Sequence, residues 1–133
     1  MKIIDVEGIG PAYAAKMKAA GIRTTDALLK EGATPEGRRQ IAERAGVGHE
    51  SILEWVNRAD LFRIKGVGSQ YSDLLENAGV DTVVELSKRV SDNLYAKMVE
   101  VNLAKNLVNK LPSEKQVQRW IEQAKKLPRV VSY

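Results

Sequence analysis

Two glycine-bounded segments contain the residues of this sequence best suited to binding an anion. Residues 6–10 read Val-Glu-Gly-Ile-Gly and residues 64–68 read Ile-Lys-Gly-Val-Gly, and a helical pattern follows each. Glycine permits a positive φ and a close approach of a second backbone. The first amides of a helix have no intrahelical acceptor, and the helix dipole makes that end positive. We therefore predict that both segments offer main-chain donors to phosphate groups.

The candidate contact residues form matching sets in the two segments. The predicted amide donors are Gly8, Gly10 and Ala12 in the first segment and Gly66, Gly68 and Gln70 in the second. The turns are completed by Ile9, Val67 and Ser69. Such donors contact the phosphate backbone and not the bases, so any recognition of nucleic acid would be independent of its sequence.

Flanking charges distinguish the two segments. The first follows Asp5 and Glu7, whereas Arg63 and Lys65 occupy the same places before the second. A phosphate is repelled by the first pair and attracted by the second. The second segment is therefore predicted to dominate. For the first segment to bind a phosphate, Lys16 and Lys18 on the helix that follows it would have to add positive charge.

Both segments belong to an internal repeat. Residues 6–24 return 58 positions later as residues 64–82, with agreement at Gly8/Gly66, Ile9/Val67, Gly10/Gly68, Tyr13/Tyr71, Met17/Leu75, Ala20/Ala78, Gly21/Gly79 and Thr24/Thr82. Trp55 is echoed by Trp120, 65 positions on, so the second copy has extra residues, which we place in the polar stretch 105–113. The repeat predicts two units, residues 1–61 and 62–133, packed as one compact domain.

Capping residues predict the helix boundaries. Helix starts are indicated at Gly10–Pro11, Thr34–Pro35, Ser69, Thr82 and Ser113. Helix ends are indicated at Gly21, Gly46, Gly79 and Pro128. Apolar residues recur at helical spacing and strand signals are nearly absent, so the predicted fold class is all-α.

The repeated pattern of a hydrophobic residue, any residue, glycine, a hydrophobic residue and glycine resembles the helix-hairpin-helix motif of many DNA repair and replication proteins. Over its full length, with its spaced tryptophans and terminal Leu-Pro-Arg-Val-Val-Ser-Tyr, the chain resembles a small bacterial family catalogued as domain of unknown function 4332. The resemblance implies two tandem hairpin units in a SAM-like array of helices. It also implies two phosphate-binding sites that contact the DNA backbone across a minor groove. The family itself has no demonstrated activity.

The predicted function is sequence-independent binding of double-stranded DNA. Lys and Arg number 21 against 17 Asp and Glu, and the whole excess lies from Phe62 onward, which favours an anionic partner for the second unit. An alternative is a protein-interaction or self-association module without nucleic acid, including a homodimer, because the net charge is modest and the first hairpin is acidic. A third interpretation treats the glycine turns as connectors and residues 105–129 as a solvated basic face.

A different DNA-binding signature competes locally. Residues 41–57 resemble the helix-turn-helix of bacterial repressors, whose second helix enters the major groove. Here that helix would present Glu50 and Glu54 to phosphates, which lowers affinity. We therefore favour the glycine hairpins.

Enzymatic function is not expected. Cysteine is absent and His49 is the single histidine, which excludes thiol nucleophiles and thiolate zinc sites and leaves no histidine pair for a metal. No Ser/His/Asp set, phosphate loop or dinucleotide fingerprint is present. We predict no catalytic residue, no metal, no cofactor and no small-molecule substrate.

Two further expectations concern location and the C-terminus. No apolar run of membrane-spanning length and no secretion signal is found, so we expect a cytoplasmic protein without membrane contact. Only residues 1–6 precede the first hairpin, where a helix precedes the second. Residues 129–133 are apolar enough to cover that face, in the same chain or in a partner molecule.

Overall fold

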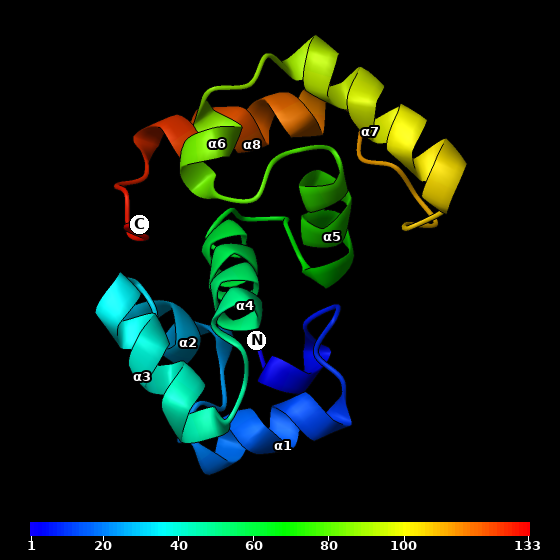
Figure 1. The fold of residues 1–133 in the computed structure, drawn as a ribbon. Helices are drawn as coiled ribbons and strands as arrows, with labels where there is room; N and C mark the ends of the chain where they lie inside the picture. The colour runs from blue at the N-terminus through cyan, green and yellow to red at the C-terminus, as the bar shows by residue number, and fades with distance from the viewer. The chain divides into compact units, whose positions relative to one another are not determined.

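The computed structural model describes residues 1–133 and is built from helices (Figure 1). Eight α-helices and one 3-10 turn account for the regular structure, and a single isolated β-bridge joins Lys2 to Thr24. The all-α prediction is confirmed. The chain divides into two units, Met1–Asp60 with Val130–Tyr133, and Leu61–Arg129.

The helices follow the same order in both halves of the chain. The first half contains η1 (Ile3–Asp5), α1 (Pro11–Ala19), α2 (Thr25–Glu31), α3 (Pro35–Ala45) and α4 (His49–Leu61). The second half contains α5 (Ser69–Asn77), α6 (Val83–Ser87), α7 (Ser91–Lys105) and α8 (Glu114–Lys126). Helix α7 is 15 residues long where α3 is 11. The extra residues of the second copy therefore lie in α7 as well as in the predicted stretch 105–113, whose first residue, Lys105, ends α7.

Capping chemistry places the helix starts where the sequence indicated. Pro11 is the first residue of α1, after Gly10 as N-cap. In the second copy Gly68 is the N-cap and Ser69 is the first helical residue. Side-chain oxygens of threonine or serine accept a hydrogen bond from the amide three residues on at the starts of α2, α3, α6 and α8.

Left-handed glycines end α1 and α5. Gly21 has a φ of +89° and Gly79 a φ of +93°. Beyond each glycine the chain folds back on its helix, since Ile22 N donates to Met17 O and Val80 N donates to Leu75 O, both at 2.9 Å. This pairing is the Schellman motif, which satisfies the last carbonyls of a helix.

The core of the first unit forms beneath α1. Helix α1 packs against η1 and α3, and α2 packs against α3. Ile3 and Val6 are buried, so the 3-10 turn itself covers the face that has no preceding helix. Tyr13 meets Trp55 edge to face, with ring centroids 5.2 Å apart.

The C-terminal residues complete the first unit at another place. Ser132 N donates to Ala33 O at 2.8 Å, and Arg38 Nη2 donates to Ser132 O at 2.7 Å. Tyr133 OH donates to Asn57 Oδ1 at 3.0 Å. The segment Val130–Tyr133 therefore lies against the start of α3 and against α4, and not against the first glycine turn as the sequence suggested.

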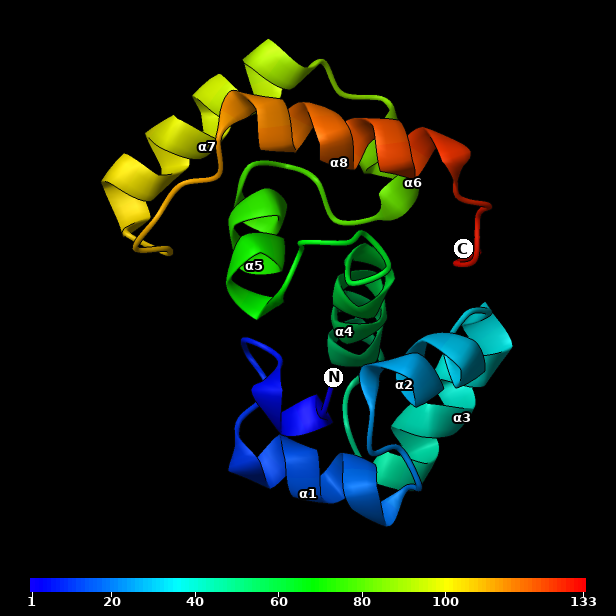
Figure 2. The same cartoon turned by 180° about the vertical axis from the view of Figure 1, so that it is seen from behind.

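The second unit is organised around α8. Helix α8 packs against α6 and α7, and α7 packs against α5 (Figure 1 and Figure 2). The predicted apolar stripe of α8 is buried along Val117, Trp120, Ile121 and Ala124. Trp120 contacts Tyr71 with ring centroids 5.4 Å apart, which matches the tyrosine and tryptophan contact of the first unit. Both tryptophans are thus core residues.

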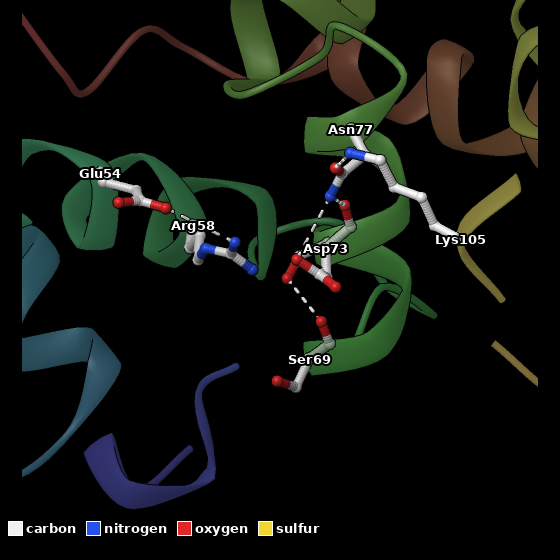
Figure 3. A network of polar contacts seen from close by, with 7 residues as sticks. Glu54, Arg58, Ser69, Asp73, Asn77 and Lys105 are labelled. Atoms are coloured by element: carbon white, nitrogen blue, oxygen red, sulfur yellow. Dashed lines mark hydrogen bonds and ion pairs between the residues drawn. The ribbon is translucent and has the colours of Figure 1, made fainter. Parts of the chain in front are cut away.

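Polar contacts fix the end of α5 (Figure 3). Asn77 Nδ2 donates to Asp73 O at 2.8 Å, and Lys105 Nζ donates to Asn77 Oδ1 at 2.6 Å (Figure 3). These contacts join the last turn of α5 to the last residue of α7. In the first unit, Arg58 Nη2 lies 3.6 Å from Glu54 Oε1, one turn earlier on α4 (Figure 3).

Candidate nucleic-acid interface

The second glycine turn has the backbone geometry that an anion-binding site requires. Gly66 has a φ of +96°, and Gly68 is extended as the N-cap of α5. Between them, the Val67 side chain is buried and its amide donates to Ile64 O at 3.1 Å. Val67 therefore anchors the turn in the core and offers no main-chain donor to a ligand.

The three predicted donors of this turn are available. The amides of Gly66, Gly68 and Gln70 donate no hydrogen bond within the protein. Gly66 and Gln70 are exposed, and Gly68 is partly exposed. All three lie at or just before the positive end of α5. The turn thus offers three main-chain donors to which a phosphate could bind.

A hollow of about 460 Å³ opens at this turn. It is lined by Gly66, Gly68, Ser69, Gln70, Tyr71, Asn109 and Lys110. Tyr71 OH donates to Lys110 O at 3.0 Å, which holds the connection after α7 beside the start of α5. Lys110 is exposed and no acidic side chain lines the hollow.

Asn109 and Lys110 are site residues that the sequence analysis missed. They lie about forty positions from the glycine turn in the chain, so only the fold brings them there. The one available signal was the general excess of basic residues in the second half.

The two cations predicted beside the turn differ in their surroundings. Arg63 Nη2 donates to Pro128 O at 2.7 Å, so this guanidinium already holds a main-chain carbonyl of its own unit. The Lys65 side chain is exposed. The main chain of Lys65 is clamped by Gln123, whose Oε1 accepts from Lys65 N at 3.0 Å and whose Nε2 donates to Lys65 O at 3.3 Å. Gln123 is a further residue that spacing alone did not reveal.

The first glycine turn repeats this backbone geometry. Gly8 has a φ of +88°, and Gly10 is the extended N-cap of α1. Ile9 is buried and its amide donates to Val6 O at 3.1 Å, as Val67 does in the second turn. The amides of Gly8, Gly10 and Ala12 donate no hydrogen bond within the protein.

The cations expected to assist the first turn lie further along α1. Lys16 Nζ lies over the Tyr13 ring, 5.7 Å from its centroid. Lys18 follows Gly10 by eight residues, which is about 12 Å along the helix axis. Lys18 lines a separate hollow with Lys2 and Arg23. The first turn thus has the donors of the second without equivalents of Lys65 and Lys110.

Replacing Gly66 by alanine is expected to destabilise the protein more than replacing Gly8. Both positions have a positive φ, which costs an alanine about 1–3 kcal/mol. A Cβ at Gly66 would also lie 3.1 Å from Nε1 of the buried Trp120, whereas nothing lies within 4 Å of one at Gly8. We expect the difference between the two variants to be about 1 kcal/mol in urea unfolding. Gly48 has neither a positive φ nor a crowded Cβ position, so Gly48→Ala is the control. Equal losses of stability in Gly66→Ala and Gly8→Ala would contradict the Trp120 contact.

The fold and these turns define an all-helical protein with a glycine turn at the start of α1 and another at the start of α5. The chain belongs to the family described as Domain of unknown function (DUF4332), whose model matches residues 7–127. The predicted family membership is confirmed. Comparisons with curated proteins and with solved structures find no significant match. None of the helices has the length and apolar character needed to cross a bilayer.

Proposed function

We propose that the protein binds double-stranded DNA without sequence preference, chiefly through the second glycine turn. The observation that carries the proposal is the set of three amides without acceptors at the start of α5, those of Gly66, Gly68 and Gln70. Lys65 and Lys110 add exposed positive charge beside them. Main-chain donors at a helix N-terminus, supported by cations, suit a phosphate group.

The proposal extends the likeness of both turns to helix-hairpin-helix motifs. In that class the hairpin amides contact the phosphate backbone, and such contacts position a protein on DNA without reading its bases. Affinity would then come from neutralised phosphates, which corresponds to dissociation constants of roughly 10⁻⁴ to 10⁻⁶ M at physiological salt. The first turn would contribute less, because Asp5 and Glu7 flank it.

The test is a salt series of fluorescence-polarisation titrations with a labelled random duplex. A protein that neutralises three or four phosphates is expected to show a log-log slope of affinity against salt of roughly −3 to −4. The reason is that each neutralised phosphate releases condensed counterions. An absence of binding at about 50 mM salt, or an affinity that does not respond to salt, would contradict the proposal and favour a protein-interaction module.

A further inference from the structure

A second hollow lies wholly within the first unit and has a different chemical character. It has a volume of about 460 Å³ and opens between η1, α1 and the segment that leads into α2. Its apolar lining comes from Ile3, Ile4, Ala14 and Ile22. Ile3 and Ile22 are almost fully buried beneath it, so the apolar floor that a ligand can reach is formed mainly by Ile4, which is 45% exposed, and the partly exposed Ala14.

Three cations surround this apolar lining. Lys2, Lys18 and Arg23 all line the hollow, and all three are exposed. None of them is ion-paired within the protein, and no acidic side chain lines the hollow. Residues 1–61 carry nine basic and nine acidic residues, so this cluster is a local excess in a neutral half of the chain.

The main chain holds the cations in place. Ile3 N donates to Arg23 O at 3.1 Å, and Thr25 N donates to Met1 O at 2.9 Å. These bonds and the bridge between Lys2 and Thr24 bring the first residues of the chain to the segment after α1. Lys2 and Arg23 are therefore neighbours because of backbone pairing, and Lys18 joins them from the last turn of α1.

We propose that this hollow binds a small amphipathic carboxylate, with its hydrocarbon body on the apolar floor of Ile4 and Ala14 and its carboxylate among Lys2, Lys18 and Arg23. The volume falls within the range of small-molecule sites, which are mostly apolar with a few polar groups that fix orientation. An arginine can hold a carboxylate through two parallel hydrogen bonds, and lysines add charge. A neutral apolar ligand would leave the three positive charges unmatched, and an inorganic anion would leave the apolar floor in water.

The test uses the ¹⁵N-labelled full chain and decanoate as the probe, kept below its micellar concentration. Saturable amide shift changes are expected at residues 2–4, 14–18 and 22–24. Decanol has the same hydrocarbon chain without the charge and is expected to bind at least tenfold more weakly. Decanol binding as tight as decanoate binding, or shift changes centred on other residues, would overturn the proposal.

Two variants separate the charge from the apolar floor. Lys18→Glu combined with Arg23→Glu is expected to weaken decanoate binding at least tenfold. Ala14→Leu is expected to weaken it by filling the hollow while all three cations remain. Lys30→Glu, an exposed lysine of the same unit outside the hollow, is the control and is expected to change affinity less than twofold. Lys30→Glu makes half the change in net charge of the double variant, so a loss in the control of half the logarithmic size or more would show that net charge is responsible and would overturn the proposal. The amide spectra report whether each variant is folded.

Discussion

Reversing the charge of Lys65 and Lys110 together is expected to weaken binding to random duplex DNA by roughly a hundredfold at about 0.1 M salt. Both side chains are exposed, and both belong to the surroundings of the second glycine turn. If each lysine contacts one phosphate, counterion release raises the binding affinity roughly tenfold per contact at this salt concentration. The new glutamates would add repulsion of the phosphates. Fluorescence polarisation with the duplex of the salt series gives the measurement.

A charge-matched control is available in the same unit. Lys115→Glu with Lys126→Glu makes the same change in net charge at two exposed positions of α8 that do not line the hollow. We expect this pair to reduce affinity by a much smaller factor. Equal losses in the two double variants would indicate diffuse attraction to a basic surface, and no loss in either would show that the second turn is not the site.

Arg63 is left unchanged in this experiment for a structural reason. Its Nη2 donates to Pro128 O, so Arg63→Glu would disrupt the unit in addition to removing a charge. A loss of binding in that variant would not distinguish the two causes. Lys65→Glu and Lys110→Glu leave their main-chain contacts with Gln123 and Tyr71 in place.

Replacing Arg38 by methionine is expected to lower the free energy of unfolding by about 3 kcal/mol. Arg38 is 2% exposed, and its guanidinium donates to Gly32 O at 2.8 Å and to Ser132 O at 2.7 Å. Methionine fills much of the space but leaves the buried Gly32 carbonyl and the partly buried Ser132 carbonyl without this donor. A buried polar group left unsatisfied costs about 1–3 kcal/mol, and the cost at Ser132 is smaller because water can reach it. Burial lowers the pKa of Arg38, and Tyr133 opposes this shift. Burying the charged guanidinium therefore costs free energy. Methionine avoids that cost, which offsets part of the loss in stability.

Urea unfolding measures this effect, and the neighbouring arginine supplies the control. Arg39 is exposed and lies 3.5 Å from Glu36 in a surface ion pair. Such pairs contribute little, so Arg39→Met is expected to cost about 0.5 kcal/mol or less. Hydrogen exchange should also show faster exchange of the Ser132 amide in Arg38→Met alone. Similar stabilities for the two variants would mean that the buried guanidinium does not hold the C-terminal segment.

The features that the sequence predicted well depend on a few adjacent residues. Gly21 and Gly79 end helices because a left-handed residue is needed there, and Thr34 and Ser113 begin helices because their oxygens accept nearby amides. Spacing of this kind is visible without knowledge of the fold. The positive φ of Gly66 belongs to the same group.

The features that were missed depend on packing between distant segments. Lys110 reaches the glycine turn through the hydrogen bond from Tyr71, and Gln123 reaches it from α8. Arg38 lies in a charged stretch that reads as a surface, yet it is buried because the C-terminal segment covers it. No local pattern indicates which of several cations approach a turn, so these contacts required the structure.

The position of Val130–Tyr133 has a consequence for biosynthesis. These residues belong to the first unit although the whole of the second unit precedes them in the chain, so the second unit is topologically an insertion within the first. A ribosome that makes the chain from its N-terminus therefore completes residues 61–129 before Ser132 exists to accept from Arg38. Until then the Arg38 guanidinium lacks this acceptor, so the first unit gains this contact only after the whole second unit has been made.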